Sequence, residues 1–138
     1  NFSRRQKVST LVAVFLGGGL GACSRYLLSH AVSQQFYFSK IPLGTLAANA
    51  IGSLLIGFFF QMFQSIAVPS YVRVAVAVGF IGAFTTFSTY ILEILQLGLK
   101  RQYLSAVYTF ILQNVLGFAM VITGILLAGK LLQQIKGA

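Results

Sequence analysis

Long apolar stretches with almost no charge dominate the pattern of this chain. No charged residue interrupts Ile41–Val72, Val74–Leu92 or Gln102–Gly129, and Val8–Ser24 is also uncharged. A helix needs about 20 predominantly apolar residues to cross the hydrocarbon core of a bilayer. The pattern therefore predicts four membrane spans joined by short connections, one of them Ser29–Pro42. The expected spans are about 8–28, 43–65, 72–97 and 104–127.

Composition supports an all-α, multi-pass protein of the cell membrane, with one domain over residues 1–138. Only 8% of the residues are charged, against roughly a quarter in soluble domains. The single cysteine, Cys23, excludes an internal disulfide. Arg4, Arg5 and Lys7 precede the first apolar run as in a signal peptide, but no small-x-small cleavage pattern follows before Arg25. We therefore expect the first span to be retained.

Basic residues give the chain a formal net charge of +9, and they lie almost wholly at the ends of the apolar spans. This placement indicates topology signals and interfacial anchors, so we expect no nucleic-acid partner. Four spans put both termini on one side of the bilayer. That side, with the second connection, carries Arg4, Arg5, Lys7, Arg73, Lys130 and Lys136, against Lys40, Lys100 and Arg101 plus Arg25 near a helix end. Six against three or four is a mild bias, which permits insertion in both orientations.

Glycines suit close approach between the spans. Gly17 and Gly21 have the small-xxx-small spacing, and the chain has 14 glycines in all. Helices in lipid associate through small residues and interhelical hydrogen bonds. We therefore expect tight packing within a compact bundle or dimer.

The third span has an unusual composition. Gly79–Tyr90 holds two glycines, three threonines, a serine and four aromatic residues. Gly lowers helix propensity, and Ser or Thr hydroxyls can bind freed backbone groups, so we expect an interruption near Gly82–Thr86. Phe84, Phe87 and Tyr90, spaced three apart, would share one face and offer electropositive ring edges to an anion. An unbroken helix with an aromatic packing stripe would have the same composition.

Polar side chains occur inside the other spans. Asn49 lies in the second span, and Gln113 and Asn114 lie in the middle of the fourth. Such amides form interhelical hydrogen bonds or line a polar pathway. Arg25 lies near the end of a span, and so does Glu93, which is the only acidic residue of the chain. At such positions their side chains could extend to the lipid headgroups.

Two classes of function fit these features. One is a small ion channel lined by hydroxyl, amide and aromatic groups. The other is a proton-coupled exporter of the small multidrug resistance type, which relies on an acid in its first span and on Trp. This chain has no acid in the first span and no Trp. A passive scaffold subunit would leave the threonine-rich span unexplained, and no catalytic or metal-ligand cluster indicates an enzyme.

Three segments together resemble the CrcB/Fluc fluoride channel family. They are Gly17-Gly-Gly-Leu-Gly-Ala-Cys-Ser-Arg-Tyr26, Pro42-Leu-Gly-Thr-Leu-Ala-Ala-Asn49 and Gly79-Phe-Ile-Gly-Ala-Phe-Thr-Thr-Phe-Ser-Thr-Tyr-Ile-Leu-Glu93. Their order and spacing match over Gly17–Glu93. The resemblance implies a passive channel that exports cytoplasmic fluoride through two pores. It also implies an antiparallel, dual-topology dimer, formed with itself or with a homologous second subunit.

The resemblance also implies roles for particular residues. A sodium ion at the dimer centre would be held by the backbone carbonyls of Gly82 and Thr85. Tyr90 stands where the family usually has phenylalanine, so it keeps a ring edge and adds a hydroxyl. The expected anion-contacting residues are Asn49, Thr86, Phe87, Ser88 and Tyr90. Further functional candidates are Arg25, Glu93 and Asn114.

Overall fold

The computed structural model describes residues 4–137, with side chains for residues 4–135. Every regular element in this part of the chain is helical. The elements are α1 (Arg4–Gln35), α2 (Leu43–Ser65), α3 (Ser70–Val74), the π-helical segment η1 (Ala75–Ile81), α4 (Gly82–Phe84), α5 (Phe87–Leu99) and α6 (Tyr103–Gly137). Four stretches are long and apolar enough to cross a membrane: Arg4–Gln35, Leu43–Ser65, Ser70–Leu99 and Tyr103–Ile135. The predicted four-span, all-α architecture is confirmed.

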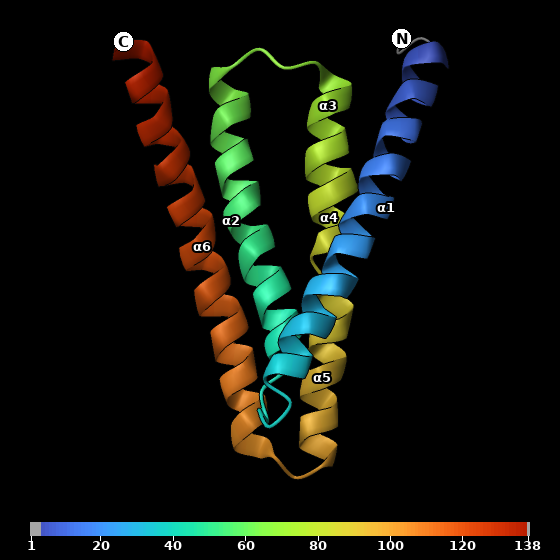
Figure 1. Ribbon diagram of the computed structural model, residues 1–138, viewed down its shortest axis with the longest axis vertical. Helices are drawn as coiled ribbons and strands as arrows, with labels where there is room; N and C mark the ends of the chain where they lie inside the picture. Colours follow the sequence, from blue (N-terminus) through green and yellow to red (C-terminus); the bar gives the residue numbers. More distant parts are fainter. Residues whose placement is uncertain (1–3, 138) are drawn as a thin grey trace.

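The connections alternate between the two ends of the bundle. Both termini and the α2–α3 connection lie at one end, and the α1–α2 and α5–α6 connections lie at the other (Figure 1). This is the arrangement that an even number of spans requires. The basic residues Arg4, Arg5 and Arg73 therefore share one end, as predicted. The side chain of Lys136 lies outside the described residues.

Glycines set which helices pack most closely. α2 packs most extensively along α6, and α1 packs along η1, so the main neighbours are not successive in the sequence. A Cβ atom at Gly21 would collide with the carbonyl oxygen of Phe80, and one at Gly57 with that of Val121. Backbone therefore lies directly against backbone at both crossings, as small residues allow in lipid.

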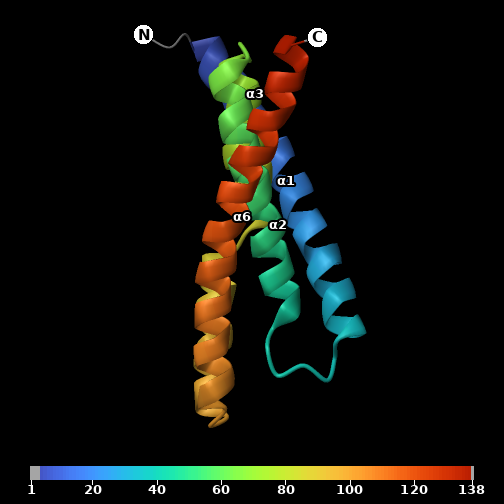
Figure 2. The same cartoon turned by 90° about the vertical axis from the view of Figure 1, so that its left-hand side faces the viewer.

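The helices extend beyond the predicted spans. The expectation that Ser29–Pro42 is a connection is wrong for its first half, because α1 continues to Gln35. No glycine or proline follows Ser29 until Pro42, so nothing in that segment ends the helix. At its far end α1 diverges from α5 and α6 (Figure 2).

The third span is broken in its middle, which confirms the predicted interruption. The backbone is extended at Thr85 (φ −92°, ψ 159°) and at Thr86 (φ −149°, ψ 120°). Thr86 then caps α5, because its hydroxyl oxygen accepts a hydrogen bond from the Thr89 N–H at 3.3 Å. The π-helical segment η1 before the break was not predicted.

Candidate functional site: a polar cavity at the break

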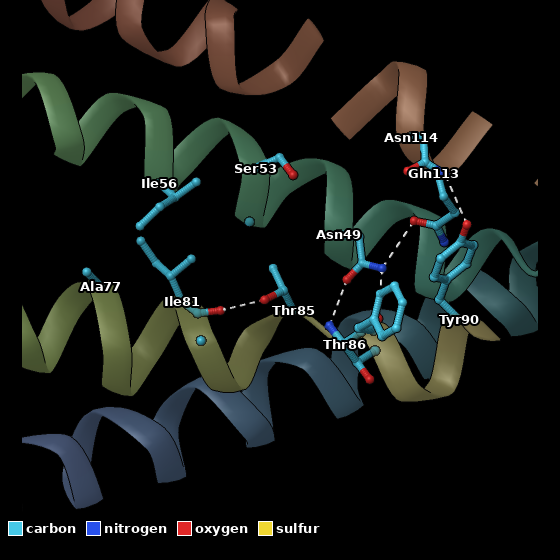
Figure 3. Close-up of a pocket in the computed structure, with 13 residues that line it drawn as sticks. Asn49, Ser53, Ile56, Ala77, Ile81, Thr85, Thr86, Tyr90, Gln113 and Asn114 are labelled. Carbon is cyan, nitrogen blue, oxygen red and sulfur yellow. Dashed lines mark hydrogen bonds between the residues drawn. The ribbon is translucent and has the colours of Figure 1, made fainter. Parts of the chain in front are cut away.

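A cavity of about 410 Å³ opens beside the break, between α2, the third span and α6. It brings together seven of the residues to which the sequence analysis gave a functional role, which are Asn49, Gly82, Thr85, Thr86, Phe87, Tyr90 and Asn114. Figure 3 shows the amide, hydroxyl and aromatic groups converging from the three spans. Ser88 is exposed and does not line this cavity.

Asn49 binds both backbone groups of Thr86. The Thr86 N–H donates to Asn49 Oδ1 at 2.8 Å, and Asn49 Nδ2 donates to the Thr86 carbonyl at 3.1 Å. In an unbroken helix the Thr86 N–H would bind the carbonyl four residues earlier, which is that of Gly82. Asn49 thus replaces the helical hydrogen bond that the break removes from the Thr86 N–H.

Gln113 continues this network onto α6, although it was not among the expected site residues. Asn49 Nδ2 donates to Gln113 Oε1 at 3.1 Å. Gln113 is only 8% exposed, and its Nε2 has no hydrogen-bond partner in the described part of the chain. Thr109, four residues earlier, is 1% exposed and its hydroxyl is likewise unpartnered there. The spacing of four between Thr109 and Gln113, which places both on one face of a helix, was the signal available in the sequence.

Phe87 and Tyr90 form the aromatic wall of the cavity. Their ring centroids are 5.7 Å apart at an interplanar angle of 66°. Tyr90 is 5% exposed, and its hydroxyl oxygen accepts a hydrogen bond from Asn114 Nδ2 at 3.0 Å. Phe87 is 74% exposed, so one side of its ring is open in the single chain.

Phe84 does not belong to this wall, so the predicted shared face is wrong for that residue. Phe84 is buried and stacks on Phe80, with ring centroids 5.8 Å apart. The extended residues Thr85 and Thr86 lie between Phe84 and Phe87. They interrupt the helical phase on which the spacing of three depended.

Arg25 and Glu93 lie at a second cavity of about 340 Å³, toward the divergent end of α1. Arg25 Nε donates to the Ala83 carbonyl at 3.1 Å, so it binds the chain just before the break. Thr45 Oγ1 donates to Glu93 Oε1 at 2.6 Å, while Glu93 Oε2 is buried without a partner among the described residues. Both residues thus have partners inside the protein, which extension to the headgroups would not give.

The fold and the cavity define a multi-pass membrane protein with polar groups gathered at a broken span. Comparison with known protein families identifies the family to which the chain belongs. The model of the family described as CrcB-like protein, Camphor Resistance (CrcB), matches residues 12–125. The chain belongs to the CrcB family.

Similar proteins extend over most of the chain. The Fluoride-specific ion channel FluC of Desulforapulum autotrophicum is 43% identical over 122 residues, covering 88% of this chain and 96% of that protein. The protein of the same name from a Hydrogenobaculum species is 40% identical, covering 87% of this chain and 98% of that protein. Fluoride-specific ion channel FluC 2 of Mycobacterium tuberculosis is 36% identical, covering 85% and 89%.

Proposed function

We propose that this protein is a passive, fluoride-selective ion channel of the cell membrane that lets cytoplasmic fluoride escape. The observation that carries the proposal is the polar cavity at the broken third span. The chain that forms this cavity matches relatives named fluoride-specific ion channels over nearly their full length. These relatives favour a channel over both an enzyme and the proton-coupled exporter considered from the sequence. Fluoride is the proposed permeant ion.

The proposed pathway uses many weak partners. Asn49, Thr86, Phe87 and Tyr90 line the cavity with amide, hydroxyl and aromatic groups. Conduction requires binding that is favourable enough for entry and weak enough for exit, and neutral groups meet both needs. Ser88 is exposed on the single chain, so we propose that it reaches the pathway only in the assembled protein.

Three further residues would support the pathway. Arg25 holds the segment before the break through the Ala83 carbonyl, and Asn114 holds the Tyr90 hydroxyl. Both are therefore proposed as positioning residues. Glu93 lines the second cavity with Arg25 and is proposed to act at one mouth of the pathway.

A sodium ion at the break is supported by the backbone geometry. The Thr86 N–H donates to Asn49, so the Gly82 carbonyl does not accept the hydrogen bond that it would accept in an unbroken helix. Gly82 is also exposed. Thr85, in extended backbone, follows the last turn before the break. Hard cations take several oxygen ligands, so the carbonyls of Gly82 and Thr85 would need the same pair from a second subunit. Bound there, sodium would supply a fixed positive charge.

An antiparallel dimer is the proposed assembly. Irregular backbone and polar groups at membrane depth are stable only against protein or a water-filled cavity, yet Gly82, Phe87 and Ser88 are exposed in the single chain. A two-fold related partner would cover them, and closed two-fold dimers are the commonest oligomers. The partner is proposed to be a second, inverted copy of this chain, with a homologous subunit as the alternative.

Ion flux from liposomes tests the proposed function. Purified protein in vesicles loaded with fluoride should release it down its gradient, and vesicles loaded with chloride should retain theirs. Protein-free vesicles give the background leak. Equal efflux rates for the two anions would contradict fluoride selectivity. Uptake of a cationic drug driven by a proton gradient would support the alternative function, a proton-coupled exporter.

A further inference from the structure

Arg73 is an exposed arginine that two contacts hold against the end of the bundle. Its Nε donates to the Val68 carbonyl at 3.1 Å, and its guanidinium group lies over the Phe63 ring, 5.9 Å from the ring centroid. The Nε–H is one of five donors that a guanidinium group carries. The other four, on the two Nη atoms, have no hydrogen-bond partner among residues 4–135. The protein thus orients this side chain and leaves most of its donors free.

No side-chain carboxylate of this chain offsets the charge of Arg73. The chain has 10 lysine and arginine residues and one acidic residue, Glu93. Glu93 lines its cavities together with residues of the α1–α2 connection. That connection and the α2–α3 connection, which precedes Arg73, lie at opposite ends of the bundle (Figure 1). The negative charge that pairs with Arg73 therefore comes from outside the chain.

Arg73 lies at the head of an apolar groove. A cavity of about 270 Å³ is lined by two polar residues, Arg73 and Gln64, and by four apolar ones, Ile56, Phe60, Phe63 and Ala77. A second cavity, of about 260 Å³, shares Ile56 and Phe60 with the first and is lined only by residues of α2 and α6 without polar side chains. We call the two adjoining cavities the apolar groove. Phe60 is 54% exposed, so the groove opens on the surface of the single chain.

The position of Arg73 along its span places it at the depth of the lipid headgroups. The third span, Ser70–Leu99, has 30 residues, and Arg73 is the fourth of them. Since about 20 residues cross the hydrocarbon core, the ends of this span extend beyond it. The groove continues from Arg73 toward the middle of the membrane, because Ile56 and Ala77 also line the cavity at the break. A ligand that fits both parts has an anionic head and an apolar tail.

We propose that Arg73 binds the phosphate group of an anionic phospholipid and that one acyl chain of this lipid lies in the apolar groove. Guanidinium groups bind phosphate oxygens through paired, charge-assisted hydrogen bonds. Free phosphate would leave the groove empty, and a zwitterionic headgroup brings a positive charge of its own. A second copy of this chain has no free carboxylate to offer, because its one acid is half-buried and bonded to Thr45. The inference does not depend on the proposed channel function.

Lipid titration followed by native mass spectrometry tests the site on the full-length protein. Delipidated protein in detergent should bind phosphatidylglycerol, and Arg73→Gln should weaken that binding by about tenfold or more, because a charge-assisted hydrogen bond is lost. Arg5→Gln is the matched control. Arg5 is an exposed basic residue at the same end of the bundle and lines neither cavity of the groove, so its replacement should leave the affinity unchanged.

Two further ligands separate the head from the tail. Phosphatidylcholine with the same acyl chains should bind about tenfold more weakly than phosphatidylglycerol, and glycerol phosphate, which has no acyl chain, should not displace the lipid. Each variant is first checked for a wild-type melting temperature.

Four results would overturn the proposal. Equal losses in Arg73→Gln and Arg5→Gln would indicate diffuse attraction to all basic residues. Equal affinity for the two lipids would remove the role of the phosphate charge. Displacement by glycerol phosphate would indicate a site for free phosphate that makes no use of the groove. Wild-type protein that binds no phosphatidylglycerol would leave the groove to a second protein chain.

Discussion

At the scale of single residues, the candidate site includes side chains that keep part of their surface free of contacts after the chain has folded. Phe87 packs against Tyr90 and leaves most of its ring exposed. Tyr90, by contrast, is buried and held through its hydroxyl by Asn114. The two aromatic residues therefore differ, because Tyr90 is fixed inside the protein and Phe87 leaves most of its ring exposed.

Replacing Phe87 by isoleucine should reduce fluoride efflux by roughly tenfold or more, because it removes the polarised ring edge and keeps apolar volume. Liposome efflux measures the loss. Phe15→Ile, at an 80% exposed position of α1 that lines neither cavity, is the matched control and should leave the rate unchanged. Equal rates for the two variants would show that the pathway avoids Phe87.

At the scale of elements, close backbone contact holds the third span against α1. Gly21 lies on the Phe80 backbone, and Gly79 lies on Val14 and Gly17. The contact positions the segment just before the break, so its loss would disturb the cavity from a distance.

Gly21→Ala should destabilise the protein by about 1–3 kcal/mol, because the added methyl group meets a carbonyl oxygen that cannot move freely. Gly19→Ala is the control: it lies on the same helix, and a Cβ there meets nothing within 4 Å. Thermal unfolding in detergent should show a lower melting temperature only for Gly21→Ala. Equal melting temperatures would mean that α1 and η1 separate easily.

The sequence predicted the secondary-structure elements better than it predicted which side chains contact one another. Uncharged runs located the four spans, and the clustered glycine and threonine residues located the break. The sequence did not show that Asn49 would bind Thr86, because that bond depends on how α2 approaches the third span. For the same reason the hydrogen bond between Asn49 and Gln113 did not follow from the sequence. Phe84 was misplaced because the break alters the helical phase by an amount that no spacing rule supplies.

At the scale of the whole molecule, the single chain leaves part of the candidate site exposed. The exposed ring of Phe87 and the exposed Gly82 both lie at the break, in the middle of a span. The two ends also differ only mildly in basic residues, with six at one end against three or four at the other. The exposed break is a surface that the proposed partner could cover, and the mild charge bias permits that partner to be inverted.

Dual insertion can be measured by labelling from one side of intact cells. Ala67 is exposed in the α2–α3 connection, so Ala67→Cys in a Cys23→Ser background should be labelled in about half of the molecules if the two orientations are equally populated. Ser39→Cys, in the connection at the opposite end, should give the same fraction. Complete labelling of one cysteine and none of the other would reject the inverted homodimer and require a second, homologous chain.

Removing sodium should destabilise the assembled protein. A ligand at one hundred times its dissociation constant stabilises the native state by about 2.7 kcal/mol. Dialysis into N-methylglucamine chloride should therefore lower the melting temperature, and added sodium should restore it at constant ionic strength. A melting temperature that does not depend on sodium would leave the Gly82 and Thr85 carbonyls without the proposed ion.

The break also gives the middle of the third span an electrical polarity that an unbroken helix lacks. The segment that ends at Phe84 presents carbonyl oxygens there, and α5 begins at Phe87 with its first N–H groups. The macrodipole places about half an elementary charge, negative and positive respectively, at these two ends. A cation and an anion can therefore occupy neighbouring places, each offsetting the charge of the other, with the field supplied by the peptide backbone rather than by an ionisable side chain.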